Sequence, residues 1–360
     1  MHLRQWLPPL VATAFAASIV GVARGEAAPP PPRTIMTVAS KDGTPIVAEC
    51  AGAGPQLVIV HGGTGDRTRW TPLFPFLVSR FRVCAMDRRS HGASGDSVPY
   101  SLQKEAEDVA AVVDSLPGEV FVLGHSYGGV CALEASFLTG RIARLILYEP
   151  PLQDRDHSAV ADAMETMLRE GDRELATTTF MRDIVMISPA EIAAMQARPS
   201  WPALVASIES SIRQARALSK YRFDPERMKG LNVPTLLLMG SETASPQLRQ
   251  AIAGLLDSLP NRRLYVFEGQ EPFSAITVSS RAAGQPSLSD CSAKLAQICL
   301  VAGKRSSDSS SVSRAASKVS FMPRPLYPTP PRRRRSSAAP VAPRPPAGAP
   351  DRARSGPATH

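Results

Sequence analysis

The feature that most constrains the fold is a serine, Ser126, set between Gly124 and Gly128 in the spacing G-x-S-x-G. An apolar run at 120–123 precedes it and a helical pattern at 130–138 follows, which predicts a strand, a sharp turn and a helix. So tight a turn strains its central residue and brings strand and helix together, so the flanking positions require glycine. We expect the serine hydroxyl to stand clear of the sheet edge, with the following amide facing the place of an oxyanion.

Strand and helix patterns alternate on both sides of this turn. Apolar strand patterns occur at 35–39, 45–50, 56–60, 81–86, 120–123, 145–148, 235–239 and 263–267, and helical patterns at 102–116, 130–138 and 246–259. The first two strands form a β-hairpin around Gly43. Continuous apolar strands separated by helices predict an α/β fold with a mostly parallel central sheet flanked by helices.

A region of different character interrupts this core. Residues 152–229 carry few strand signals, and amphipathic helices are expected at 161–170, 190–197 and 203–218. We interpret the region as a helical lid inserted between two parts of the core, 34–151 and 230–271. Its methionines and a tryptophan indicate either an apolar pocket or plain core packing. These residues are Met164, Met167, Met181, Met186 and Trp201.

The amino end predicts a targeting segment. Arg4 precedes an apolar run at 6–23 with small residues after it, so residues 1–27 are interpreted as a secretory signal peptide or an N-terminal anchor. A Pro-rich linker, 28–33, follows. We expect export to the periplasm or the medium, or anchoring in the membrane. A start site placed too early, with the protein beginning near Met36, would instead make it cytoplasmic.

The charge of the chain is concentrated at its carboxyl end. The formal net charge is +9, but residues 304–360 alone carry +10, so the rest is nearly neutral. The core is therefore not expected to bind nucleic acid. Residues 272–360 form a low-complexity tail, rich in Ser, Pro and Arg, that we expect to be largely disordered. Its arginine run, 332–335, leaves open binding to anionic membrane or nucleic acid.

The five cysteines show no spacing typical of a metal site, and we predict neither a metal nor a cofactor. Cys84 and Cys131 fall in apolar patterns and are interpreted as small buried hydrophobic residues. Cys291 and Cys299 could pair in an oxidising compartment.

Two further loops follow predicted strands. His61–Gly65 is glycine-rich, so its backbone amides can approach a ligand closely, but no lysine follows in the register of a phosphate-binding loop. After the next strand, Asp87 and His91 could form a catalytic pair. We favour a structural interpretation, in which the Asp87 carboxylate caps the following loop through backbone amides.

From about Thr37 to Gln270 the chain resembles the α/β-hydrolase superfamily, and within it the lidded serine hydrolases of esterase, lipase and perhydrolase type. The resemblance implies that Ser126 is the nucleophile and that Gly63 and Tyr127 supply the oxyanion amides. Glu242 is the only carboxylate in the turn after 235–239 and matches the catalytic acid of the family, and Glu149 is the alternative.

The activity implied by this resemblance is hydrolysis of a small carboxylic ester, thioester or lactone through an acyl-enzyme on Ser126. Related enzymes with epoxide hydrolase or dehalogenase activity carry aspartate at this position, so the serine favours acyl transfer. His61 and His125 are assigned to substrate binding. We expect a monomer that takes a small-molecule substrate and has no obligate protein partner.

The chain departs from the family where the catalytic histidine is due. Pro272 stands near that place, and none of the six histidines lies between 158 and 359. A general base contributes roughly 10²- to 10⁴-fold, so we expect impaired catalysis. His157 is interpreted as a surface helix residue, with a movement toward Ser126 as the weaker alternative. The abrupt change of composition after Glu271 suggests a shifted reading frame. A non-catalytic protein that binds a small apolar ligand under the lid is the alternative function.

Overall fold

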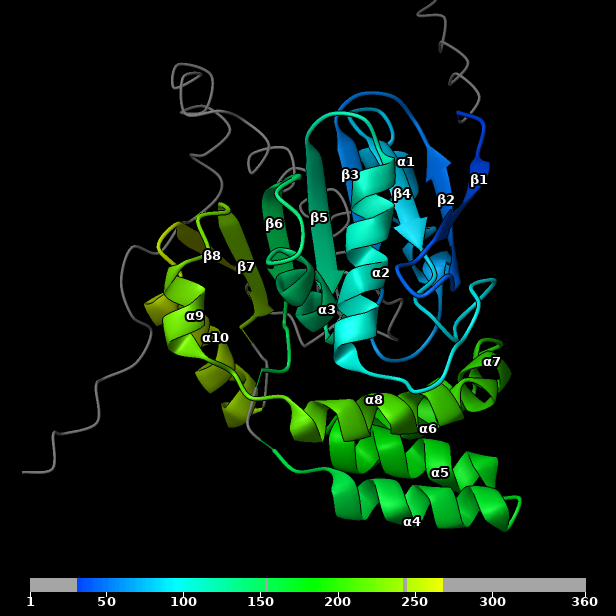
Figure 1. Ribbon diagram of the computed structural model, residues 1–360. Helices are drawn as coiled ribbons and strands as arrows, with labels where there is room; N and C mark the ends of the chain where they lie inside the picture. The colour runs from blue at the N-terminus through cyan, green and yellow to red at the C-terminus, as the bar shows by residue number, and fades with distance from the viewer. Residues whose placement is uncertain (1–30, 153–154, 242–244, 268–360) are drawn as a thin grey trace, which may run out of the picture. The chain divides into compact units, whose positions relative to one another are not determined.

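The computed structural model describes residues 31–152, 155–241 and 245–267. In these ranges, eight strands form one sheet in the order β1-β2-β4-β3-β5-β6-β7-β8 (Figure 1). The strands are β1 (Thr34–Ala39), β2 (Pro45–Ala51), β3 (Gln56–Val60), β4 (Arg82–Met86), β5 (Val120–His125), β6 (Ile142–Tyr148), β7 (Thr235–Gly240) and β8 (Arg262–Phe267). The pairs β1–β2 and β2–β4 are antiparallel and all other pairs are parallel. The predicted α/β fold with a mostly parallel sheet is confirmed.

Helices connect these strands and pack on the sheet. The core helices are η1 (Arg67–Trp70), α1 (Phe74–Leu77), α2 (Leu102–Ser115), α3 (Tyr127–Ala135), α9 (Pro225–Lys229) and α10 (Pro246–Ser258). Successive strand residues alternate between two apolar clusters, as the period of two in a strand requires. Val58 and Val60 join the cluster under α2 and α3, whereas Leu57 and Ile59 join the cluster that includes Trp70. The sheet is thus buried on both faces.

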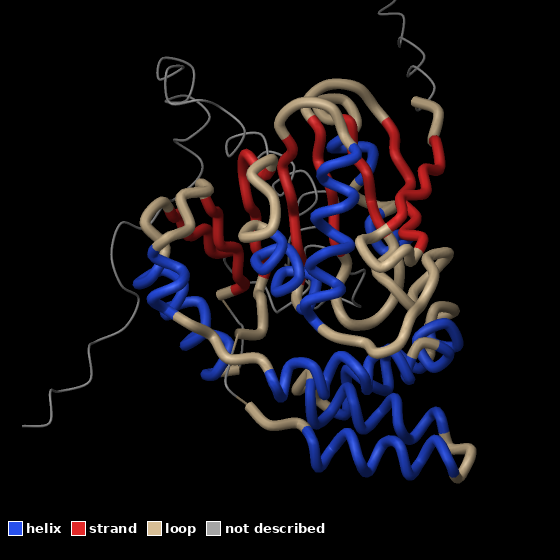
Figure 2. Tube along the Cα trace, viewed as in Figure 1, coloured by secondary structure: helices blue, strands red, loops and turns tan. Residues whose placement is uncertain are grey.

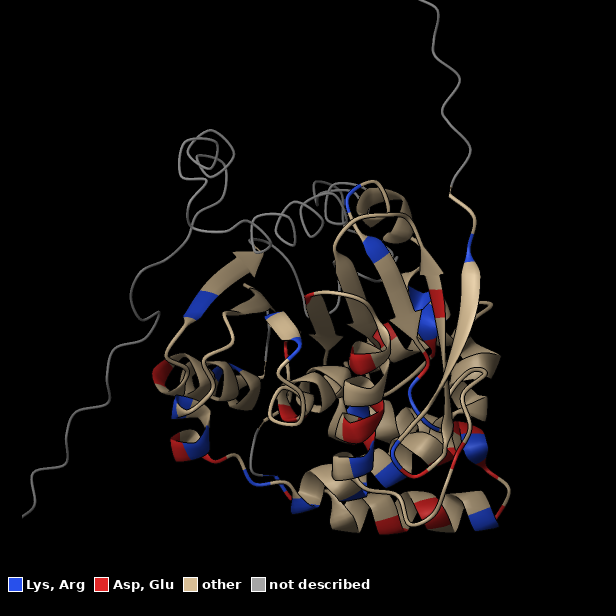
Figure 3. Ribbon diagram, turned by 45° about the horizontal axis from the view of Figure 1, so that its top comes forward, with Lys and Arg blue, Asp and Glu red and all other residues tan. Residues whose placement is uncertain are grey.

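The central strands explain why this sheet needs cover on both sides. β3, β5 and β7 contain no Lys, Arg, Asp or Glu, and every residue in them is buried. Figure 3 shows that the charged residues lie mostly on helices and loops. Burying one aliphatic side chain contributes about 1.5–3 kcal/mol, so these strands are stable only between two layers of helices.

The lid is a helical layer beside the carboxyl ends of the central strands (Figure 2). It comprises α4 (Ser158–Arg169), α5 (Arg173–Thr179), η2 (Phe180–Ile184), α6 (Pro189–Gln196), α7 (Trp201–Ala206) and α8 (Ile208–Lys220). Met164, Met181 and Trp201 are buried in one cluster inside the lid, which confirms core packing for them, whereas Met186 is exposed.

The lid contains two features that the helical periodicity did not predict. The expected helix at 203–218 is broken at Ser207, whose hydroxyl donates to the Leu204 carbonyl oxygen over 2.9 Å. A serine that bonds to its own preceding turn competes with the helix and ends it. The additional helix α5 begins where the Asp172 side chain accepts a hydrogen bond from the Leu175 amide.

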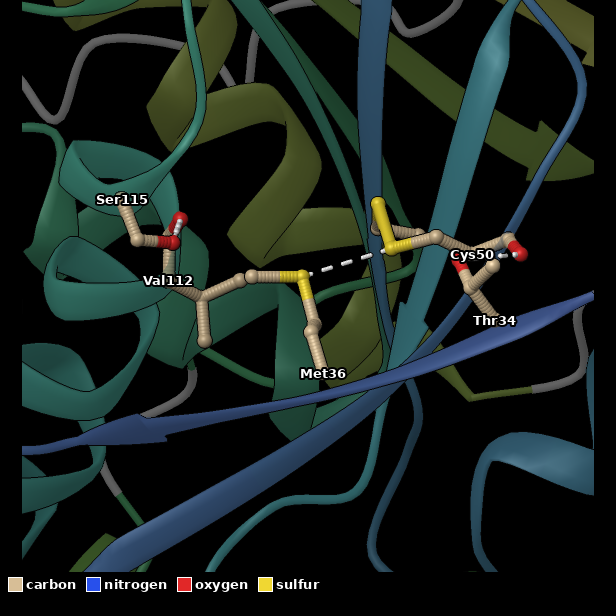
Figure 4. The surroundings of a disulfide bond; sticks show 6 residues. Thr34, Met36, Cys50, Val112 and Ser115 are labelled. Carbon is tan, nitrogen blue, oxygen red and sulfur yellow. Dashed lines mark hydrogen bonds between the residues drawn. A yellow bond between two sulfur atoms is a disulfide. The ribbon is translucent and has the colours of Figure 1, made fainter.

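A disulfide joins Cys50 on β2 to Cys84 on β4 (Figure 4). The two residues are direct partners in the antiparallel register, and the Met36 sulfur lies 3.4 Å from the Cys50 Sγ. Cys84 is buried as predicted, and its bond to Cys50 is a pairing that the sequence analysis did not predict. Strand patterns alone do not show which strands are neighbours, so this pairing could not be read from the sequence. Cys131 is buried, as predicted, and its thiol is free.

Several predictions fall outside the described residues. These are the targeting segment 1–27, most of the linker 28–33, Glu242, the tail 272–360 with its shifted frame, and the pairing of Cys291 with Cys299. Within the described ranges, no helix combines the length and the apolar character needed to cross a membrane.

Candidate active site

Ser126 occupies a strained turn between β5 and α3. Its backbone has φ 50° and ψ −127°, a region that costs a non-glycine residue conformational energy. Two backbone hydrogen bonds of 2.8 Å hold it, one from the Ser126 amide to the Tyr148 oxygen and one from the Gly129 amide to the Ser126 oxygen. Ser126 is partly exposed, whereas His125 and Tyr127 on either side are buried. The turn therefore presents the serine from an otherwise closed edge.

Glycines let the turn pack closely against the loop after β3. A side-chain carbon added to Gly124 would lie 2.5 Å from the Gly128 oxygen, and one added to Gly128 would lie 2.2 Å from the His61 oxygen. One added to Gly62 would lie 3.1 Å from the Ser126 Cβ. Because β3 and β5 are parallel neighbours, their ends meet at one edge of the sheet. The structure thus brings together the two glycine-rich segments that the sequence singled out.

The two predicted oxyanion donors lie on these two segments. Tyr127 is the first residue of α3, where a backbone N–H has no acceptor within the helix. Gly63 follows Gly62, which packs against Ser126, and is partly exposed. The Tyr127 amide thus follows the serine directly in the chain, and the Gly63 amide lies on the loop whose Gly62 packs against Ser126. The role of both amides toward an oxyanion stays a prediction.

The two histidines assigned to substrate binding are buried. The His61 Nδ1 donates to the Gly62 oxygen over 2.8 Å, and its Nε2 accepts from the Arg88 amide over 3.1 Å. The His125 ring packs against Trp70 and Tyr148, with ring centroids 6.1 and 5.3 Å apart. Burial lowers the pKa of both imidazoles well below the usual value, so both are neutral. His61 uses both ring nitrogens on the protein backbone, and the assignment to substrate binding stays a prediction.

Of the two candidates for the acid of the triad, only Glu149 lies among the described residues, directly after the end of β6. Its backbone has φ 48°, its side chain is buried, and its Oε1 accepts from the Gly240 amide over 2.9 Å. Because Gly240 ends β7, this carboxylate ties the ends of two neighbouring strands together. Glu242, two residues further along, lies outside the described residues.

His157 is buried at the start of α4, so its interpretation as a surface residue is wrong. Its backbone amide donates to the Ser219 Oγ over 2.8 Å, and Ser219 belongs to α8. His157 is thus buried where α4 packs against α8, and burial lowers the pKa of its imidazole. Helical periodicity placed this residue on a surface because it does not show which helix lies opposite.

The structural interpretation of Asp87 is confirmed. The Asp87 carboxylate accepts from the backbone amides of Arg67 and Ala93, both over 2.8 Å. The two arginines that follow are entirely buried: Arg88 pairs with Glu105, and Arg89 pairs with Asp108. The signal for these pairs was present, because both acids lie on one face of the predicted helix at 102–116.

The described residues contain no group of three or more His, Cys, Asp or Glu side chains placed to hold a metal ion. Among the residues that the structure describes, the carboxyl ends of β3, β5 and β6 carry the Ser126 hydroxyl, backbone amides, the neutral imidazoles of His61 and His125 and the Glu149 carboxylate.

Residues 57–270 match the family model described as "Alpha/beta hydrolase family". Among solved structures, an alpha/beta hydrolase from Sphaerobacter thermophilus is 33% identical with a TM-score of 0.61, and the alignment covers 72% of this chain and 98% of that one. An esterase from Rhodococcus is 26% identical with a TM-score of 0.52, and the alignment covers 66% and 91% of the two chains.

Curated relatives match over shorter stretches. A pimeloyl-[acyl-carrier protein] methyl ester esterase from Methylococcus capsulatus is 35% identical over 100 residues, which is 28% of this chain and 38% of that protein. The enzyme of the same name from Aeromonas hydrophila is 28% identical over 207 residues, 57% of this chain and 62% of that protein. The chain spans less than two thirds of the length of either relative.

Proposed function

Because the chain belongs to the alpha/beta hydrolase family, we propose that it hydrolyses small carboxylic esters, thioesters or lactones with Ser126 as the nucleophile. One observation carries the proposal: a partly exposed serine with positive φ, packed against the glycine loop after β3. The esterases among its relatives support an ester as the substrate class.

The proposed reaction proceeds in two steps. The Ser126 Oγ attacks the carbonyl carbon, and the negative charge on the carbonyl oxygen is stabilised by the Gly63 and Tyr127 amides. The Ser126 proton passes through solvent water to the alcohol or thiol, which leaves, or to the ring oxygen of a lactone, whose C–O bond opens. Water then cleaves the acyl-serine, which releases the carboxylic acid and restores the Ser126 hydroxyl. We assign Glu242 the place of the acid in the catalytic triad, the carboxylate that would orient a histidine; that histidine is missing from its expected place in this chain.

Turnover is expected to be slow. No histidine occupies residues 158–359, and His61 commits both ring nitrogens to the backbone. A missing general base removes roughly 10²- to 10⁴-fold of the rate. An oxyanion site and substrate binding alone still give on the order of 10³- to 10⁴-fold over water.

The test is hydrolysis of a series of p-nitrophenyl esters by the full chain and by Ser126→Ala. We expect slow product release that depends on Ser126 and favours short acyl chains. Ser136→Ala, at the other end of α3, is the matched control and should hydrolyse at the parental rate. Equal rates in Ser126→Ala and the parent would overturn the proposal.

The missing histidine also favours a second candidate function, a non-catalytic protein that binds a small apolar ligand under the lid. This candidate predicts that the esters bind without Ser126-dependent product release. To detect such binding, a fluorescent fatty acid is bound to the protein and an apolar ketone of the same length as the ester is added. A fall in the bound fluorescence would show that the ketone occupies the same site.

We also propose that the protein is exported and acts in an oxidising compartment, as a monomer. The Cys50–Cys84 disulfide supports this location, because disulfides are rare in the cytosol. The predicted signal at 1–27 points the same way. Fractionation of cells that express the full gene tests it: an intact amino end confined to the cytoplasm would contradict export.

A further inference from the structure

We propose that Gln214, on the lid helix α8, is a positioning residue that fixes the peptide between Gly62 and Gly63 through the side chain of Arg88. The inference rests on the proposed function, because this peptide carries the Gly63 N–H that we assign to the oxyanion. It adds a named connection between the lid and the reacting edge of the sheet.

The orientation of this peptide is set by its carbonyl oxygen. A trans peptide is planar, so its C=O and N–H point in opposite directions. The Gly62 oxygen accepts two hydrogen bonds, from the His61 Nδ1 over 2.8 Å and from the Arg88 Nη2 over 2.9 Å. These two donors hold the oxygen on one side of the loop, and the Gly63 N–H must therefore point to the other side.

The tautomer of His61 agrees with this arrangement. Its Nε2 accepts from the Arg88 backbone amide, so the proton of the neutral ring lies on Nδ1 and can only be donated to the Gly62 oxygen. The backbone and the side chain of Arg88 thus act on the same loop, one through His61 and one directly.

Arg88 is in turn held from four directions, one of which is the His91 Nε2, 3.3 Å from the Arg88 Nη2. Its Nη1 donates to the Glu105 Oε1 over 2.8 Å, and its guanidinium lies over the Tyr127 ring at 4.9 Å from the centroid. Its Nη2, the group that reaches the Gly62 oxygen, also donates to the Gln214 Oε1 over 3.1 Å. The Gln214 Nε2 donates to the His91 Nε2 over 2.7 Å, so both ends of this amide are fixed. Gln214 is thus the lid residue that contacts both the Arg88 Nη2 and its neighbour His91, and it helps to fix where the Nη2 points.

The lid meets the same loop at a second point. Ser211, one turn before Gln214 on α8, donates its hydroxyl to the Gly63 oxygen over 3.2 Å. A side-chain carbon added to Gly63 would lie 3.1 Å from the Gln214 Oε1, so the Gln214 amide sits directly against the loop. One face of α8 thereby controls both carbonyls around Gly63. The seating of the lid and the direction of the oxyanion amide are coupled.

Nuclear magnetic resonance of the full chain can observe this peptide directly. Only two glycines in the sequence follow another glycine, Gly63 and Gly129. Protein labelled with both ¹³C-carbonyl glycine and ¹⁵N-glycine therefore gives two signals when amides are filtered through the preceding labelled carbonyl. Gly129 donates to the Ser126 oxygen inside the turn and serves as the internal standard for folding.

Gln214→Leu should shift or split the Gly63 signal and leave the Gly129 signal in place. Gln214→Glu should return the Gly63 signal most of the way toward its parental position, because a carboxylate still accepts from the Arg88 Nη2 although it cannot donate to the His91 Nε2. Gln250→Leu, the same change on an exposed face of α10, is the matched control and should alter neither signal. An unchanged Gly63 signal in Gln214→Leu would overturn the proposal, as would equal displacement by the leucine and glutamate variants.

A second readout separates this proposal from the proposed function. The rate of phosphonylation by a fluorophosphonate should fall up to about 10²-fold in Gln214→Leu, the loss typical of one oxyanion donor, and recover in Gln214→Glu. If the parent protein does not react with the fluorophosphonate, but the Gly63 signal changes in Gln214→Leu as expected, the serine hydrolase would be refuted and the positioning role supported. If Gln214→Leu reacts with the fluorophosphonate at the parental rate and its Gly63 signal is unchanged, only the positioning role would be refuted.

Discussion

The turn after β5 and the loop after β3 have similar sequences and are held in different ways. Each follows a buried strand, and each contains a histidine followed by glycines nearby. The strained turn around Ser126 is held mostly within one short segment, by the Gly129 amide on the Ser126 oxygen and by the close approach of Gly124 and Gly128, with one further hydrogen bond from the Ser126 amide to the Tyr148 oxygen. The loop around Gly63 is instead held by the side chain of Arg88, two residues after β4, and by Ser211 and Gln214 on the lid helix α8.

This difference separates two kinds of site geometry. A turn that is determined locally forms wherever its strand and helix form, and it can be recognised from six consecutive residues. A loop that is held by remote side chains depends on the packing of the whole chain, and a change in the lid can alter it. Breaking one segment at a time should therefore give distinct effects on stability and reactivity.

The largest effect is expected from Gly128→Ala, which attacks the contact between the two segments. The added carbon would lie 2.2 Å from the His61 oxygen, and both atoms belong to or adjoin rigid backbone. We expect a loss of more than about 4 kcal/mol in the free energy of unfolding, measured by urea denaturation. Gly140→Ala is the control, because no atom lies within 4 Å of its added carbon. A loss below 1 kcal/mol at Gly128, on the order of an ordinary surface change, would contradict the packing.

Arg88→Met should come next, because it removes the remote support of the loop. It leaves the Glu105 carboxylate buried without its guanidinium partner, which costs about 3–5 kcal/mol. The double variant Arg88→Met with Glu105→Leu should regain part of this loss, since no charge is then left unpaired. Urea denaturation of both variants gives the coupling. Additive losses would show that the two side chains do not support one another.

The smallest effect is a pH dependence that arises from the loop. Burial and the nearby Arg88 charge lower the pKa of His61 in the folded protein, whereas the unfolded chain keeps a value near 6.5. The unfolded state therefore binds more protons below pH 6.5, so stability present above that pH is lost as the pH falls. For one imidazole the loss approaches about 1.4 kcal/mol per pH unit only well below pH 6.5. Between pH 7.5 and 5.5 the unfolded imidazole goes from about one tenth to about nine tenths protonated, so His61→Gln should remove about 1.4 kcal/mol in total from the loss of stability over this range, measured by urea unfolding. An unchanged loss would contradict a buried neutral His61.

The same division explains what the sequence could predict. The strands, the Ser126 turn and the cap at Asp87 depend on neighbouring residues, and each was found from local patterns. The pairing of Cys50 with Cys84 and the burial of His157 depend on which elements become neighbours in space. Gln214 lies in an expected helix and carries no signal that links it to Gly63, 151 positions earlier.

The helix predicted over 203–218 shows the same limit within one element. Its apolar periodicity is continuous, yet a hydrogen bond from the Ser207 hydroxyl divides it into α7 and α8. The burial of Arg88 and Arg89 is indicated in the sequence only through their partners: Glu105 and Asp108 share one helix face, and the fold buries that face. A buried carboxylate requires a partner, but periodicity does not say which residue supplies it.

The most direct test of the central claim, that Ser126 is a nucleophile presented by its strained turn, is peptide mapping after treatment of the folded protein with a fluorophosphonate. We predict one phosphonyl adduct, on the peptide that contains Ser126, formed slowly and absent from Ser126→Ala. A folded protein that acquires no adduct, or an adduct that persists in Ser126→Ala, would contradict the claim.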